Sequence, residues 1–150
     1  MKSIRTRLPW VAVALSLVSM PAWSLTPEEK LGKKLYFDTS LSEPAGQSCA
    51  SCHLPSAGIA DPDKLLPVSR GVIPFRVGSR NAPTASYAMY APNFHFDSEK
   101  GVYVGGQFLD GRATGDAVKN GDPLAHQALG PFLNPVEMNN SSKKEVIRDV

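Results

Sequence analysis

Apolar and polar positions along the chain predict short helices separated by long irregular segments. The clearest helix begins with the sequence Thr26-Pro27-Glu28-Glu29, in which the threonine caps the helix, the proline suits its first position and Glu29 completes a capping box. Leu31, Leu35 and Tyr36 then recur at helical spacing and form one apolar stripe. The pattern predicts a helix that ends near residues 37–38.

Later segments show weaker patterns. We expect a short helix over residues 84–90, a brief strand or hairpin around Val102 and Val104, a short helix over 124–129, a capped helix start at 134–137 and an amphipathic helix over 142–150. Residues 55–83 and 113–122 have no steady period, and we expect a long ordered loop and a surface loop there. These elements favour a mostly α fold in which long loops connect short helices.

The first 24 residues have the composition of a secretory signal peptide. Lys2, Arg5 and Arg7 form a positive region, residues 10–20 are apolar, and small residues at Ala22 and Ser24 fit a cleavage site after Ser24. Eleven apolar residues are too few to cross a bilayer comfortably, although an uncleaved anchor is the alternative. We therefore expect a signal peptide at residues 1–24, one exported domain at residues 25–150 in the periplasm, and no membrane segment after cleavage.

Cleavage changes the charge of the chain. Subtracting Lys2, Arg5 and Arg7 from the 16 basic residues leaves 13 against 14 acidic ones, a net charge near −1. A nucleic-acid-binding protein needs a basic surface, so this balance argues against nucleic acid as a partner. The 12 glycines and 13 prolines agree with a loop-rich domain.

The chain's only two cysteines lie in Cys49-Ala50-Ser51-Cys52-His53, the C-x-x-C-H pattern of covalent c-type haem attachment. The two thiols can add to the porphyrin vinyl groups, and His53 is then the proximal ligand of the iron. A thioredoxin-like redox pair, half of a zinc site and a structural disulfide are the alternatives. Export supports haem, because c-type haem is attached outside the cytoplasm. We expect one covalent haem, wrapped by the short helices and long loops.

Further motifs follow in a fixed order across the mature chain. They are Leu31-Gly32-Lys33-Lys34-Leu35-Tyr36-Phe37-Asp38, Cys49 to His53, Arg80-Asn81-Ala82-Pro83-Thr84, Gly105-Gly106-Gln107-Phe108-Leu109-Asp110-Gly111-Arg112, Gln127-Ala128-Leu129-Gly130-Pro131 and Asn134-Pro135-Val136-Glu137-Met138. In this order they resemble the N-terminal, peroxide-reacting half of the di-haem bacterial cytochrome c peroxidases and their MauG-type relatives. That resemblance implies a cytochrome c-like domain.

The resemblance also implies roles for individual residues. Gln127 and Glu137 match the distal glutamine and glutamate, and a carboxylate beside the iron can act as general base and then acid toward peroxide. Without the resemblance, Asn134-Pro135-Val136-Glu137 is equally the capped start of a helix. Asn81 matches a position near a calcium ion between two domains. Arg112 can pair with a haem propionate, or it is a surface arginine.

The chain departs from the family pattern at three places. Leu109 stands where many members carry a tryptophan between the haems, so an aromatic electron relay is not expected there. About eight extra residues fall within 113–123, and residues 61–80 contain no histidine that could occupy the iron's sixth position. His95 and His126 are alternative distal ligands, although packing is the commoner role for such histidines.

Two methionines are further candidate ligands. Met89 and Met138 could ligate the iron, with core packing expected above all for Met89.

The resemblance implies reduction of hydrogen peroxide with electrons from a small donor protein such as a cytochrome c or a cupredoxin. A mono-haem electron-transfer cytochrome and a MauG-like enzyme that oxidises another protein are the alternatives. The chain contains one C-x-x-C-H, and the apolar pattern of residues 142–150 continues to Val150. We therefore expect a longer protein in which a second haem domain follows this one.

Overall fold

The computed structural model describes residues 24–150, and the signal peptide predicted at residues 1–24 lies outside them apart from Ser24. The helices are α1 (Pro27–Tyr36), α2 (Cys49–Cys52), α3 (Pro123–Ala128), α4 (Gly130–Leu133) and α5 (Lys143–Arg148), with 3₁₀ turns at Thr39–Leu41, Pro55–Ala57 and Ala88–Tyr90. Strands β1 (His95–Asp97) and β2 (Val102–Val104) form one antiparallel hairpin. Most of the described chain is therefore loop, and the mostly α fold predicted from the sequence is not confirmed.

Helix α1 begins as its sequence predicts. Thr26 Oγ1 accepts a hydrogen bond from the Glu29 amide at 3.2 Å, and the Glu29 carboxylate accepts one from the Thr26 amide at 2.7 Å. The helix ends at Tyr36 with Phe37 as its C-cap residue, close to the end predicted near residues 37–38. Leu31 is 51 % exposed, so the C-terminal turn, rather than the whole apolar stripe, packs against α2.

The buried apolar core of residues 24–150 is small and consists of Leu41, Ala50, Ala113 and Met138. Ala113 is buried although it begins the predicted surface loop, and Met89, expected in the core, is 69 % exposed. Met89 lies in the 3₁₀ turn Ala88–Tyr90, which is all that forms of the helix predicted over residues 84–90. Tyr87, which precedes this turn, has φ 63°, a left-handed conformation that a helix cannot include.

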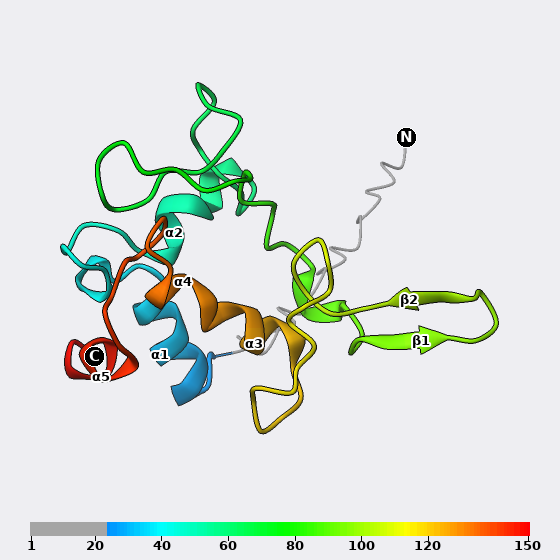
Figure 1. Ribbon diagram of the computed structural model, residues 1–150. Helices are drawn as coiled ribbons and strands as arrows, with labels where there is room; N and C mark the ends of the chain where they lie inside the picture. The colour runs from blue at the N-terminus through cyan, green and yellow to red at the C-terminus, as the bar shows by residue number, and fades with distance from the viewer. Residues whose placement is uncertain (1–23) are drawn as a thin grey trace, which may run out of the picture.

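A long loop and the hairpin lie between α2 and the C-terminal helices. The long ordered loop predicted over residues 55–83 begins with the 3₁₀ turn Pro55–Ala57 and is irregular after it, and an isolated bridge between Arg70 and Val77 holds it. The hairpin pairs His95 with Val104 and projects away from the helices (Figure 1). None of the helices between residues 24 and 150 has the length and apolar character that crossing a membrane requires.

The C-terminal part contains α3, α4 and α5 and one segment that differs from its prediction. Helix α3 confirms the helix predicted over residues 124–129, and α5 begins at the predicted cap, Ser142. Residues 134–139 form a turn instead of a helix. The Met138 amide donates to the Pro131 carbonyl and Asn139 takes φ 60°, so the chain folds back before a helix can propagate.

Candidate haem-binding site

The C-x-x-C-H motif forms its own short helix. Ser48 is the N-cap residue of α2, and its amide donates to the Ser51 hydroxyl oxygen at 3.0 Å. The His53 amide donates to the Cys49 carbonyl at 2.9 Å. Both cysteines are free thiols and partly buried on this single turn. Two free thiols three residues apart, followed by a histidine, are the donor set that covalent haem requires, and Cys49 and Cys52 do not form the disulfide that was an alternative to haem.

His53 is oriented by its neighbours. Its Nδ1 lies 3.4 Å from the Ile59 carbonyl oxygen, which can only accept a hydrogen bond. The tautomer that satisfies this contact carries hydrogen on Nδ1 and leaves the Nε2 lone pair for a metal. The Tyr36 hydroxyl donates to the His53 carbonyl oxygen, so α1 also holds this residue. His53 therefore fits the role of iron ligand.

Gln47 contacts the second cysteine, a role that the sequence analysis missed. Its Nε2 donates to the Arg70 carbonyl at 2.9 Å and lies 3.4 Å from Cys52 Sγ. Burial raises the pKa of the Cys49 and Cys52 thiols, an effect that the Gln47 contact partly opposes at Cys52. Both groups are therefore protonated thiols at neutral pH. A polar residue just before the motif is the only sequence signal for this contact.

Glu137 lies in the turn that replaces the predicted helix, and the long loop after the haem motif holds this turn. The Val72 amide donates to the Glu137 carbonyl at 2.9 Å, and a Cβ on Gly71 would lie 2.5 Å from the Val136 carbonyl oxygen. Asn134 Nδ2 donates to Glu137 Oε1 at 2.6 Å. The site thus needs a glycine at position 71, where the two segments meet.

The environment of the Glu137 carboxyl is unusual for an acid. Burial raises its pKa, while the Asn134 hydrogen bond and charge interactions with His53 and Arg112 lower it. Contacts of the long loop join this turn to the haem motif: Cys52 Sγ lies 3.8 Å from the Arg70 carbonyl oxygen, and two residues later the Val72 amide donates to Glu137. The fold thus joins segments that lie 84 residues apart at His53 and Glu137. A partly buried carboxyl with a raised pKa holds a proton more readily than a surface carboxyl, which suits it to exchange protons.

Gln127 lies on α3, and Arg112 lies in the irregular segment that precedes this helix. Gln127 is partly buried on α3, and its side chain makes no hydrogen bond within residues 24–150. Arg112 binds both carboxylate oxygens of Asp110 at 2.8 and 2.9 Å and stacks 3.8 Å over the Phe108 ring. A cavity of about 320 Å³ lies between this segment and α3–α4, and Arg112 lines it.

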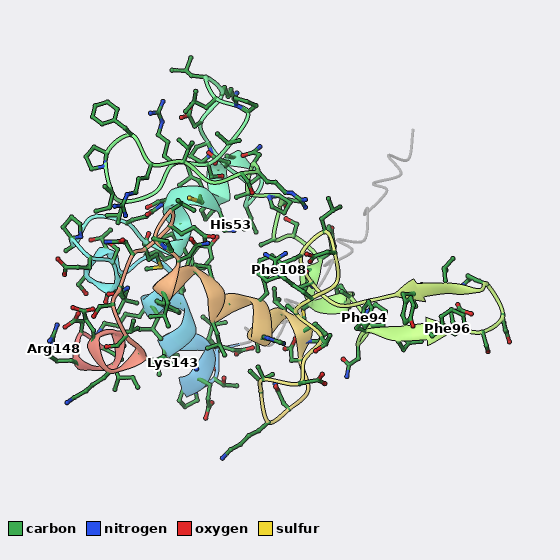
Figure 2. All side chains as sticks on the ribbon, in the orientation of Figure 1. His53, Phe94, Phe96, Phe108, Lys143 and Arg148 are labelled. Carbon is green, nitrogen blue, oxygen red and sulfur yellow. The ribbon has the colours of Figure 1, made fainter. Side chains whose placement is uncertain are left out.

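The remaining candidates lie in different surroundings. Figure 2 shows His53 at the end of α2, while Phe94 and Phe96 lie on the distant hairpin that also carries His95. His95 Nδ1 contacts the Asn93 carbonyl at 2.8 Å, and His126 Nδ1 accepts from the Gly115 amide at 3.1 Å. Both histidines thus use their Nδ1 atoms in contacts with nearby backbone groups.

Asn81 and Met138 are also placed by the structure. Asn81 Oδ1 accepts from Ser69 at 3.5 Å, and residues 24–150 contain no cluster of three or more acidic, histidine or cysteine side chains suited to a metal ion. Met138 belongs to the core, since it is 3 % exposed.

Comparisons with known proteins agree on one family. Residues 26–150 match the family model described as di-haem cytochrome c peroxidase. The chain is 47 % identical over 111 residues to the methylamine utilization protein MauG of Paracoccus denitrificans, covering 72 % of this chain and 26 % of that protein. It is 36 % identical over 114 residues to cytochrome c551 peroxidase of Pseudomonas aeruginosa, covering 76 % and 26 %.

A solved structure is similar as well. The diheme peroxidase BthA from Burkholderia thailandensis has a TM-score of 0.70 and 39 % identity, covering 80 % of this chain and 28 % of BthA. The chain therefore spans about a quarter of the length of each of these relatives.

Proposed function

The chain belongs to the di-haem cytochrome c peroxidase family, and on that premise we propose that it reduces hydrogen peroxide to water with electrons from a small redox protein. The observation that carries the proposal is the partly buried Glu137 carboxyl in a turn that residues 70–72 join to the haem motif: the Val72 amide donates to the Glu137 carbonyl, and Cys52 contacts the Arg70 carbonyl. Reduction of one hydrogen peroxide to two waters consumes two electrons and two protons. The protein must therefore deliver protons as well as electrons.

Cys49, Cys52 and His53 would hold one haem c, which supplies the iron that exchanges electrons with peroxide. The thiols form the two covalent links, and the Ile59 carbonyl keeps the His53 ring in the orientation and tautomer of a ligand. The Tyr36 hydroxyl fixes the backbone of His53 from α1. Burial raises the pKa of this hydroxyl, so it stays a donor. Arg112 is proposed to pair with a haem propionate.

Glu137 would move the proton. As a carboxylate it accepts a proton from hydrogen peroxide, and as a carboxylic acid it returns that proton to the oxygen that leaves as water. Its raised pKa suits both steps, because the two protonation states are then closer in free energy at working pH. Gln127 is proposed to hold the peroxide by hydrogen bonding from α3.

The wider setting is part of the same proposal. We propose export to the periplasm by the signal peptide at residues 1–24, and a second haem domain that passes electrons from a cytochrome c or a cupredoxin. Leu109 is aliphatic and 83 % exposed, so an electron relay through this side chain does not form part of the proposal. A calcium ion near Asn81 would lie between the two domains.

The similarity to MauG of Paracoccus denitrificans favours a second candidate, the oxidation of side chains in another protein. The same haem pocket would serve that reaction. The two candidates differ in the electron source, so mixing the peroxide-treated holoprotein with a reduced cytochrome c or with a candidate protein substrate separates them. A mono-haem electron carrier would instead contain a low-spin iron that does not react with peroxide.

The proposal predicts that Glu137→Gln leaves haem loading intact but slows peroxide-driven oxidation of the ferric iron by about 100-fold or more, the usual contribution of a general acid–base group. Stopped-flow absorbance of the haem-loaded protein measures this rate. Glu99→Gln is the matched control, because Glu99 is exposed in the turn of the hairpin, and this variant should react with peroxide like the parent. Equal rates in the parent and Glu137→Gln would contradict the proposal.

A further inference from the structure

Asn134 is the centre of the turn that carries Glu137. Its side-chain Oδ1 accepts from the Val136 amide at 3.1 Å, and its backbone carbonyl accepts from the amides of Glu137 at 3.0 Å and Asn139 at 2.9 Å. The Asn134 amide itself donates to the Pro131 carbonyl at 3.2 Å. The side-chain oxygen and both backbone polar groups of Asn134 are therefore engaged, which fixes the orientation of the side chain.

The remaining group of Asn134, its Nδ2, points at the carboxylate. It donates to Glu137 Oε1 at 2.6 Å. The other oxygen, Oε2, has no hydrogen-bond partner within residues 24–150. One oxygen is thus held and the other is left for proton exchange.

The charged and titratable groups that act on Glu137 come from two other segments. His53 at the end of α2 and Arg112 after the hairpin lower its pKa, and Cys52 experiences the charge of Glu137 in turn. The loop segment at Gly71 and Val72 contacts the turn through backbone atoms alone. Among the influences that favour the ionised carboxylate, the Asn134 hydrogen bond is the largest.

We propose that Asn134 is a positioning residue that holds Glu137 Oε1 and thereby orients Oε2 for proton transfer to and from peroxide. This inference rests on the proposed function of Glu137. A capping role alone would require only Oδ1, which the Val136 amide already occupies. The Nδ2 bond to the carboxylate is additional and couples the turn to the chemistry.

Asn134→Ser tests the inference in the haem-loaded chain. A serine hydroxyl can still accept from the Val136 amide but is too short to reach Glu137 as the asparagine does. The rate constant for peroxide is expected to fall on the acidic side of its pH profile, and we call this part of the profile the acid limb. In Asn134→Ser the acid limb should shift to higher pH by about one unit, the size expected for losing one hydrogen bond to a charged oxygen. Difference infrared spectra against Glu137→Gln should show the carboxyl stretch of residue 137 disappearing at the same higher pH.

Asn139→Ser is the matched control, because Asn139 belongs to the same turn but bonds the Glu43 carbonyl and Arg76 instead of Glu137. We expect its acid limb and its infrared titration to match the parent. If Asn134→Ser does not fold, Asn134→Asp keeps the acceptor for Val136 and should shift the limb further upward, because a second carboxylate then faces Glu137.

The outcomes separate the two proposals. An unshifted acid limb and infrared titration in Asn134→Ser, with Glu137→Gln inactive, would overturn the role of Asn134 alone. Equal shifts in Asn134→Ser and Asn139→Ser would also overturn it, since general loosening of the turn would then be the cause. An active Glu137→Gln would overturn the proposed function, while the infrared titration would still report whether Asn134 holds the carboxylate.

Discussion

The half-buried Glu137 carboxyl has a cost for the folded protein. Burial makes the ionised form less favourable in the folded state than in the unfolded chain, and one hydrogen bond from Asn134 offsets only part of this effect. A carboxylate on the surface would cost less stability, but its lower pKa would make it hold the transferred proton less readily. The proposed chemistry therefore explains why a destabilising residue is found in this turn.

This cost predicts a pH-dependent stability difference. Because the folded pKa is raised, the folded state binds more protons, and its stability decreases as pH rises through the folded pKa. Glu137→Gln keeps the oxygen that accepts from Asn134 and removes the ionisation. We expect the variant to melt at a higher temperature than the parent at pH 7, with the difference vanishing below the ordinary pKa range of glutamate.

Thermal melts of the haem-loaded protein between pH 3 and 8 measure this difference, and Glu99→Gln on the exposed hairpin should show none. A melting-temperature difference that does not change with pH would contradict the prediction, because the effect would then come from packing and not from ionisation.

Individual residues differ in how far the sequence predicts them. Cys49, Cys52 and His53 could be assigned from sequence because their relation is local and chemical. Glu137 could be assigned only through the family resemblance, because its neighbourhood to His53 depends on chain segments far apart in sequence. The role of Gln47 could not be predicted, since its contact is the carbonyl of Arg70 in a loop without a sequence pattern.

At the scale of elements, local hydrogen bonding decides which predictions are confirmed. The start of α1 was predictable because the capping box joins Thr26 and Glu29 within one turn. The same kind of signal at Asn134 predicted a helix that does not form. There, the Met138 amide bonds the Pro131 carbonyl and Arg76 contacts both Pro135 and Asn139, so tertiary contacts determine the backbone.

The capping box of α1 yields a prediction at this scale. Thr26→Ala removes the acceptor of the Glu29 amide, and we expect the free energy of unfolding to fall by about 1 kcal/mol. Urea titration followed by circular dichroism measures it. Ser98→Ala in the exposed hairpin turn is the control and should change stability little. A loss in Thr26→Ala no larger than that in the control would show that tertiary contacts hold this helix.

At the scale of the whole molecule, segments nearly a hundred residues apart are joined beside the haem motif. The Glu43 amide donates to the Met138 carbonyl at 2.8 Å, and Asn139 Nδ2 donates to the Glu43 carbonyl at 2.8 Å. The segment leading into Cys49 and the turn holding Glu137 therefore form one unit. With so small an apolar core in residues 24–150, such polar links between segments carry a large share of the tertiary structure.

Asn140 forms a further buried link of this kind and gives a prediction for the whole fold. Its Nδ2 donates to the carbonyls of Leu41 at 2.8 Å and Phe132 at 2.9 Å, and it is 5 % exposed. Asn140→Ala leaves the Leu41 carbonyl without a donor among residues 24–150, so we expect a loss of about 2 kcal/mol in the free energy of unfolding.

Because the link joins the haem-motif segment to the segment beside Glu137, haem absorbance and far-ultraviolet circular dichroism should report one shared transition at lower urea. Asn120→Ala, at an exposed loop position, should leave both midpoints unchanged. Separate transitions in Asn140→Ala would mean that the two segments fold independently and that the site is not one unit.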